Sequence, residues 1–283
     1  MQRRPHLTEP VWLRTILIVM VLGWLGLFLI LPLVVVFHEA LQRGWQTYLA
    51  AFTQRDAQHA IQLSLLTAAI SVVLNTTFGI AAAWLLTRYR FRGRQVLLTL
   101  VDLPFAVSPV IAGLVFVLLF GLQGLLGPTL REWNIQIIFA LPGIVLATVF
   151  VTLPFVVREL IPIMEAVGSE EEQAARVLGA SGFTILWRIT LPNVKWGLLY
   201  GVILCTARAL GEFGAVSVVS GHIRGQTSTL PLHIEVLYND YQSSAAFACA
   251  SLLSLFGVVV LVVKEVVAWR QRAQLARSNG SAT

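Results

Sequence analysis

Charged residues are scarce in this chain. Only 12% of its 283 residues are Asp, Glu, Lys or Arg, whereas 57% are hydrophobic. An ordinary soluble domain carries about 25% charged residues. The composition therefore excludes a typical water-exposed globule and indicates an all-α membrane protein.

The chain also lacks the motifs of several enzyme classes. No GxxxxGK[ST] phosphate loop is present, and the similar stretch at residues 221–228 has the wrong spacing and no lysine. His38-Glu39 is not followed by a histidine at the spacing of a zinc-binding helix. Cys205 and Cys249 lie in hydrophobic runs, where we expect them to pack as small apolar residues. We therefore expect no catalytic site, no metal site and no cofactor bound by this chain, so that energy for uphill transport must come from another chain or from an ion gradient.

Long hydrophobic runs predict six membrane-spanning helices. Residues 16–37 contain 22 residues without a charge, and at about 1.5 Å per residue they span roughly 33 Å, enough to cross a hydrocarbon core of about 30 Å. This first run is longer than the core of a cleaved signal peptide, so we expect it to be retained. The predicted spans are residues 15–37, 60–87, 96–121, 135–157, 196–219 and 246–268.

The distribution of Lys and Arg predicts the orientation of these spans. Fifteen of the 20 basic residues fall in the two tails and in the connections on one side, and only four fall on the other side. Basic residues accumulate on the cytoplasmic side of a membrane, so both termini and the connection at residues 158–193 are predicted to be cytoplasmic. The same bias explains the net charge of +6 without nucleic acid.

A polar insert at residues 169–192 interrupts the hydrophobic sequence. Ser169 and Glu172 have the spacing of a helix capping box, Gly179 is placed to end that helix, and Pro192 is placed to start the next span. Two interpretations fit these features. The insert is either a linker helix that only connects two spans or a surface on which a soluble partner docks.

The insert resembles the EAA motif of ABC-transporter permeases, EAA-x3-G-x9-I-x-LP. One position departs from the motif, because Gln173 replaces its leading Glu and the neighbouring Glu172 points elsewhere on a helix. The resemblance implies that the helix ending at the glycine docks in a groove of an ATPase subunit. The residues that this assigns to ATPase coupling are Glu172, Gln173, Ala174, Ala175, Gly179, Ala180, Ile189, Leu191 and Pro192.

Further segments are similar to the W-type subunits of sulfate/thiosulfate permeases. They lie at residues 102–113, 151–159, 178–182 and 207–221. The resemblance implies the fold of a type I ABC importer permease in the bacterial cytoplasmic (inner) membrane. The implied partners are a T-type permease subunit, two copies of an ATP-binding subunit that uses ATP, an external sulfate/thiosulfate-binding protein and membrane lipid. Molybdate and T-type sulfate permeases share related patterns.

The resemblance also sets the expected domains. Residues 1–59 would hold the N-terminal tail, the first span and an external loop, residues 60–264 the permease domain, and residues 265–283 a cytoplasmic tail.

A few polar residues lie inside the predicted spans, where charges are costly and usually face protein or water. Arg208 and Glu212 are four residues apart and share a helix face, so they either neutralise each other structurally or line an anion path. Asp102 is either beside a path-facing helix break at residues 104–109 or near the interface, within reach of Arg92 and Arg94. Ser108, Ser217 and Ser220 complete the candidate pathway.

Three functional classes are thus weighed. The first is the permease subunit of an ATP-driven sulfate/thiosulfate importer, with a molybdate or tungstate permease as the alternative within that class. The second is an ion-coupled secondary carrier, which predicts an inverted repeat that we do not find. The third is a membrane anchor for a soluble enzyme, which does not explain Arg208 and Glu212.

Overall fold

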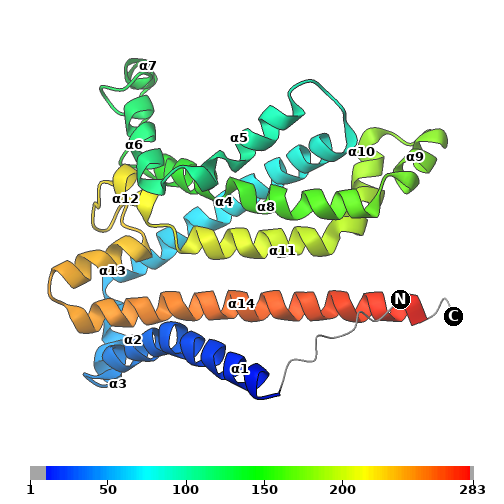
Figure 1. Ribbon diagram of the computed structural model, residues 1–283. Helices are drawn as coiled ribbons and strands as arrows, with labels where there is room; N and C mark the ends of the chain where they lie inside the picture. Colours follow the sequence, from blue (N-terminus) through cyan, green and yellow to red (C-terminus); the bar gives the residue numbers. More distant parts are fainter. Residues whose placement is uncertain (1–10, 281–283) are drawn as a thin grey trace.

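The computed structural model describes residues 11–280, and side chains within residues 11–270; every regular element in this range is a helix (Figure 1). The helices are α1 (Val11–Leu25), a π-helical turn (Gly26–Ile30), α2 (Leu31–Leu41), α3 (Trp45–Thr53), α4 (Arg55–Arg88), α5 (Arg94–Ala106), α6 (Pro109–Phe120), α7 (Gly127–Glu132), α8 (Leu141–Val167), α9 (Glu170–Val177), α10 (Gly182–Ile185), a second π-helical turn (Leu186–Thr190), α11 (Leu191–Leu210), α12 (Gly214–Ser220), α13 (Leu230–Asn239) and α14 (Ser243–Gly280).

The predicted all-helical membrane fold is confirmed. Among residues 11–280, five continuous helical stretches are long and apolar enough to cross a membrane, and the bent pair α5–α6 makes a sixth span. Proline occupies the first turn of α6, α8 and α13, where its missing N–H would have no helical partner. Pro192 does not start the fifth span as predicted, because it lies within the continuous helical stretch Gly182–Leu210. Uncharged runs therefore locate the spans, and proline marks the start of the span formed by α8.

Two predicted spans are shortened or interrupted in the structure. The span predicted at residues 135–157 starts only at Leu141, because Phe139 has a φ of 61° and its backbone N–H donates to the carbonyl of Val219 at 2.9 Å. The span predicted at residues 196–219 ends as a continuous helix at Leu210 and resumes as α12 at Gly214. Both differences come from contacts or breaks that hydropathy does not register.

The core of the bundle is formed by α4, α8 and α11. Two glycines permit the close approach of these helices. A Cβ at Gly79 would lie 2.6 Å from Val156 Cγ1, and one at Gly201 would lie 3.2 Å from the Val156 backbone. The buried Asn75 side chain links the three helices, because its Nδ2 donates to Thr152 Oγ1 at 2.7 Å and lies 3.8 Å from Cys205 Sγ.

The third span is sharply bent. The axes of α5 and α6 meet at 108° across residues 107 and 108. Pro104 lies inside α5 and Pro109 starts α6, so backbone hydrogen bonds are lost on both sides of the bend. The expected helix break is therefore present. Beyond the bend α6 packs on α12, where a Cβ at Gly113 would lie 2.8 Å from the carbonyl oxygen of Ala215.

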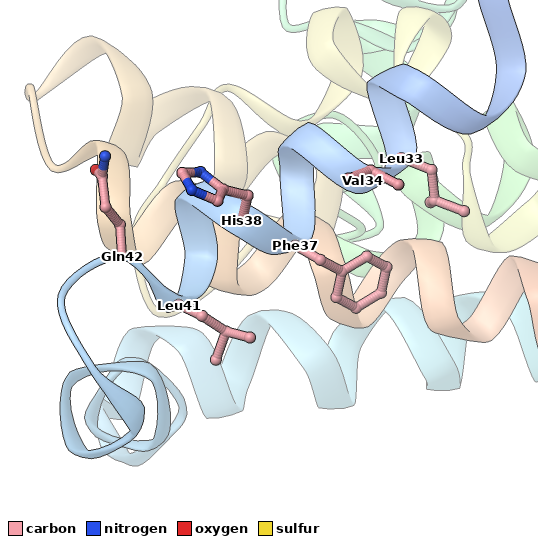
Figure 2. Close-up of a pocket in the computed structure, with 6 residues that line it drawn as sticks. All are labelled: Leu33, Val34, Phe37, His38, Leu41 and Gln42. Carbon is pink, nitrogen blue, oxygen red and sulfur yellow. The ribbon is translucent and has the colours of Figure 1, made fainter. Parts of the chain in front are cut away.

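The first two helices lie at the side of the bundle. α2 packs on α14, and α1 has no buried residue (Figure 1). A shallow cavity of about 520 Å³ on α2 is lined by Leu33, Val34, Phe37, His38, Leu41 and Gln42 (Figure 2). Its mostly apolar lining, on a helix that crosses the membrane, is a surface suited to lipid tails rather than to a polar ligand.

Candidate functional site: the polar insert and its anchor

The polar insert projects from one end of the bundle. α9 and α10 lie beyond the end of α8, at the end toward which α14 runs (Figure 1). α8 stops at Val167, and Gly168 follows with a φ of 75°. The turn after α8 leaves α9 outside the apolar bundle, where none of its apolar residues is buried.

The glycine that ends α9 was correctly predicted. Gly179 has a φ of 85°, its N–H donates to the carbonyl of Arg176 at 3.0 Å, and the N–H of Ala180 donates to the carbonyl of Ala175 at 3.0 Å. This pair of bonds is a Schellman motif, which satisfies carbonyls that the helix end leaves without partners.

The predicted capping box is wrong. The side chain of Ser169 makes no capping bond to α9; its Oγ instead accepts from Nε2 of Gln173 at 2.8 Å. The carboxylate of Glu172 is drawn into the protein rather than back to the helix start. A side-chain cap does occur on the next helix, where Ser181 Oγ accepts from the N–H of Thr184 at 3.3 Å.

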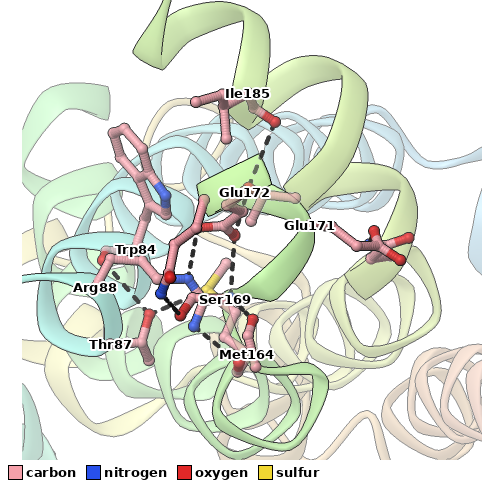
Figure 3. Close-up of polar contacts among 12 residues, drawn as sticks. Trp84, Thr87, Arg88, Met164, Ser169, Glu171, Glu172 and Ile185 are labelled. Carbon is pink, nitrogen blue, oxygen red and sulfur yellow. Dashed lines mark hydrogen bonds and ion pairs between the residues drawn. The ribbon is translucent and has the colours of Figure 1, made fainter. Parts of the chain in front are cut away.

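Glu172 is held by an arginine from the end of α4. Arg88 Nε and Nη2 donate to the two carboxylate oxygens of Glu172 at 2.8 and 3.0 Å (Figure 3). The same guanidinium donates to the backbone carbonyls of Met164 at 3.0 Å and Gly168 at 2.6 Å. Thr190 Oγ1 donates to Glu172 Oε1 at 2.8 Å. We call this set of five residues the Arg88 clamp.

The clamp is mostly shielded from water. The side chains of Arg88 and Glu172 are 11% and 12% exposed. A cavity of about 110 Å³ lies beside them, and Ile189 and Asn193 contribute to its lining. Asn193 Nδ2 donates to Glu171 Oε2 at 2.6 Å, so a second acidic residue of α9 is tied to the start of α11.

Part of the exposed surface of the insert is apolar. Four large side chains are exposed there: Val177 by 89%, Leu178 by 88%, Phe183 by 72% and Trp187 by 58%. The rings of Phe183 and Trp187 are in contact, with centroids 6.0 Å apart. We call these four residues the apolar tip. An exposed apolar group outside the lipid-facing helices is typical of a protein-docking surface.

The other residues of the motif lie on α9, in the turn after it and in the segment that follows α10. Ala174 and Ala175 are on α9, Ile189 is in the π-helical turn, and Leu191 and Pro192 start α11. The insert thus contains every residue assigned to ATPase coupling.

The ion pair within the fifth predicted span forms as expected. Arg208 Nη1 lies 2.6 Å from Glu212 Oε2, and the two side chains are 32% and 1% exposed. However, Glu212 lies just past the end of α11 rather than within a continuous helix. Its Oε1 accepts from the N–H of Ala215 at 2.9 Å, so the carboxylate also holds the first turn of α12.

Asp102 has a different partner from the one predicted. It pairs with Arg158 of α8, whose Nε and Nη2 each lie 2.6 Å from a carboxylate oxygen. Arg94 instead donates to the carbonyl of Leu86 at 2.7 Å and pairs with Glu165 at 3.3 Å. The basic loop after α4 is close to Asp102 in the sequence, but the cation closest to Asp102 in the structure is Arg158 of α8.

The candidate pathway serines are spread along the molecule. Ser108 is exposed at the α5–α6 bend, close to α12, since a Cβ at Gly214 would lie 3.1 Å from Pro109 Cβ. Ser217 Oγ donates to the carbonyl of Gly214 at 2.9 Å. Ser220 is buried, and its Oγ accepts from the N–H of His222. Ser108, Ser217 and Ser220 therefore all lie in the α6–α12 region, with Ser220 buried at the end of α12, whereas Asp102 lies on α5.

Sequence reasoning missed Arg88, Thr190 and Arg158 as partners of the acidic residues. All three are far from those residues along the chain: Arg88 and Glu172 are separated by 84 positions. The one usable signal was that Arg88 directly follows an uncharged run, at a helix end, where a cation is favoured. Its partner could not be inferred without the fold.

The chain belongs to a family of membrane permeases, the binding-protein-dependent transport system inner membrane components, whose family model matches residues 75–273. It is 53% identical over 255 residues to the sulfate transport system permease protein CysW of Synechocystis sp., with 90% of this chain and 92% of that protein covered. It is 52% identical to CysW of Escherichia coli K12 over 88% of this chain and 86% of that protein. The sulfate transport system permease protein CysT of the same organism is 37% identical over 83% of this chain and 85% of that protein.

These relatives confirm the resemblance to W-type sulfate permeases. The fold also matches the crystal structure of a bacterial alginate ABC transporter in complex with an alginate-bound periplasmic protein. The TM-score is 0.72 at 19% identity, over 90% of this chain and 92% of that chain. At this identity the match shows the fold alone, which is that of an ABC importer permease.

Proposed function

We propose that this chain is the W-type membrane subunit of an ATP-driven sulfate importer. Docking of an ATPase subunit on this chain is supported by the apolar tip. The tip belongs to the polar insert, which is bonded to the ends of three core helices. Sulfate as the cargo is supported by relatives about half identical over most of the chain, all named for sulfate transport. These names favour sulfate over molybdate or tungstate.

The proposed assembly includes a T-type permease as the second membrane subunit and two copies of an ATP-binding subunit. An external protein that binds sulfate and thiosulfate would deliver the cargo. The insert and both termini would face the cytoplasm, as the excess of basic residues on that side predicts. Family membership supports this organisation over a secondary carrier or an anchor, because the family is defined by transport that depends on a binding protein.

In this assembly the ATPase would grip α9 and α10. Closing of the ATPase dimer would displace the insert, and the displacement would pass through α4, α8 and α11 to the bend between α5 and α6. The chain itself would supply no nucleotide site, so ATP would act only through the partner. The extensive packing of α4 on α8 and the close packing at Gly79 and Gly201 support transmission of movement between these helices.

The cargo path is proposed to pass the α6–α12 region, where Ser108 and Ser217 lie. Arg208 is two-thirds buried and paired with Glu212, which weakens its attraction for an anion. Replacing Arg208 by Gln separates its two roles: a loss of sulfate uptake with unchanged thermal stability indicates a path residue, and a parallel loss of both indicates a structural one.

The test is reconstitution of this chain in liposomes with its partner permease, the ATPase and the sulfate-binding protein. We expect uptake of radiolabelled sulfate that requires ATP and is inhibited by thiosulfate. Uptake driven by an ion gradient without the ATPase, or a strong preference for molybdate, would contradict the proposal.

A further inference from the structure

The position of α9 depends on very little apolar burial. None of its apolar residues is buried, and the two ends of the helix are flanked by Gly168 and Gly179, both with positive φ. Apolar packing is the usual means of fixing a helix on a protein. For α9 the fixed points are instead polar, and the most enclosed of them is the Arg88 clamp.

The clamp connects four parts of the chain through one guanidinium. Arg88 belongs to the last turn of α4, Met164 and Gly168 to the end of α8, Glu172 to α9, and Thr190 to the turn that continues into α11. Arginine suits this position because its planar head offers five donors in fixed directions. Lysine could keep the charge but could not reach the carboxylate and both carbonyls in this geometry.

The surroundings make these bonds strong. Met164 is among the last four residues of α8, whose carbonyls have no helical partner, and a cation is favoured at that end of the helix dipole. Arg88 and Glu172 are nearly nine-tenths buried, so water competes weakly for them. Removing one partner would leave the other charge enclosed and unpaired.

We propose that Arg88 is a positioning residue that makes α9 and the adjoining ends of α4, α8 and α11 move as one body. This inference rests on the proposed function, because it identifies how a push on the apolar tip reaches the membrane helices. With the clamp intact, displacement of α9 moves three core helices together. With the clamp broken, α9 rotates about Gly168 and Gly179, and the membrane helices do not move with it.

The matched variants are Glu172→Gln and Glu165→Gln. Both glutamates pair with an arginine near this end of the bundle, but Glu165 is 54% exposed and its contact to Arg94 is 3.3 Å long. In the reconstituted importer we measure the sulfate transported per ATP hydrolysed. A hydrogen-bonded charge contributes about 1.5–3 kcal/mol, equivalent to roughly tenfold or more in an equilibrium, so we expect about a tenfold lower ratio for Glu172→Gln and Arg88→Gln. Glu165→Gln should keep the ratio of the unmodified protein.

A second readout does not depend on transport. Spin labels at Ala81→Cys on α4 and Arg176→Cys on α9 report the distance between the two helices. We expect a narrow distribution that stays the same with and without ATP, and a broad one in Arg88→Gln and Glu172→Gln. An unchanged distribution and an unchanged ratio in these variants would overturn the proposal.

Two further results would still allow the proposal to be tested. If Arg88→Gln fails to fold, Thr190→Val, which keeps the Arg88–Glu172 pair and removes one bond, decides by whether the distribution widens. If the unmodified importer shows no ATP-dependent uptake, the proposed function fails, and the spin labels alone still show whether the clamp fixes α9.

Discussion

Truncation of Leu178 should weaken binding of the ATPase without destabilising the permease. Its side chain is 88% exposed in the isolated chain, so a partner that covers the apolar tip would bury nearly all of it. Leu178→Ala removes three carbon atoms at about 0.8 kcal/mol each, or about 2.4 kcal/mol when burial is complete. At 1.4 kcal/mol per tenfold, the dissociation constant should rise about 50-fold.

The assay is titration of the purified ATPase onto the permease in nanodiscs, together with a thermal unfolding curve of each variant. Leu122→Ala is the matched control, because Leu122 is 84% exposed but lies in the loop after α6. Both variants should unfold like the unmodified chain, since exposed positions change stability by less than about 0.5 kcal/mol. Equal affinities of the two variants for the ATPase would refute the docking surface.

Three other predictions concern the chain alone. Gly179→Ala should cost about 1–2 kcal/mol of stability, because Gly179 has a φ of 85°. Gly257→Ala should be neutral or stabilising, because Gly257 lies inside α14 with open space around it. Thermal unfolding of both variants checks this difference. Glu212→Gln should lower the free energy of unfolding by about 3 kcal/mol and Asp102→Asn by less than about 1 kcal/mol. The reason is burial, because the Glu212 side chain is 1% exposed and that of Asp102 is 33% exposed. Equal losses of stability in denaturant unfolding would contradict this ranking. Burial lowers the pKa of His233 from its ordinary value of 6.5. As the pH falls below about 6.5, the unfolded chain therefore protonates this histidine before the folded chain does, and the free energy of unfolding should decrease. In a pH series of melting temperatures, His233→Gln should show a smaller decrease over this range than the unmodified chain.

The spans and the end of α9 could be predicted because their signals are local. Uncharged runs reveal membrane helices, and Gly179 reveals a positive φ, since each depends on a few neighbouring residues. The motif also predicted that the insert is the functional region. Its residues could therefore be named before any fold was known.

The internal arrangement of the insert could not be predicted, because it depends on long-range pairs. Glu172 appeared to complete a capping box with Ser169, but Arg88 from a distant helix offers a charged, buried partner that a backbone N–H in water cannot match. For the same reason, Asp102 pairs with Arg158 of a distant helix rather than with the basic loop near it in the sequence. The local sequence pattern thus assigned the wrong partners to Glu172 and Asp102.

The sidedness of the apolar tip tests the central claim most directly. A single reactive cysteine at Leu178→Cys can be labelled with a membrane-impermeant maleimide, because Cys205 and Cys249 are both 0% exposed. We predict labelling in inside-out vesicles, its absence in right-side-out vesicles, and protection when the ATPase is added. Labelling from the outer face, or labelling that the ATPase does not reduce, would contradict an importer driven from the cytoplasm through this insert.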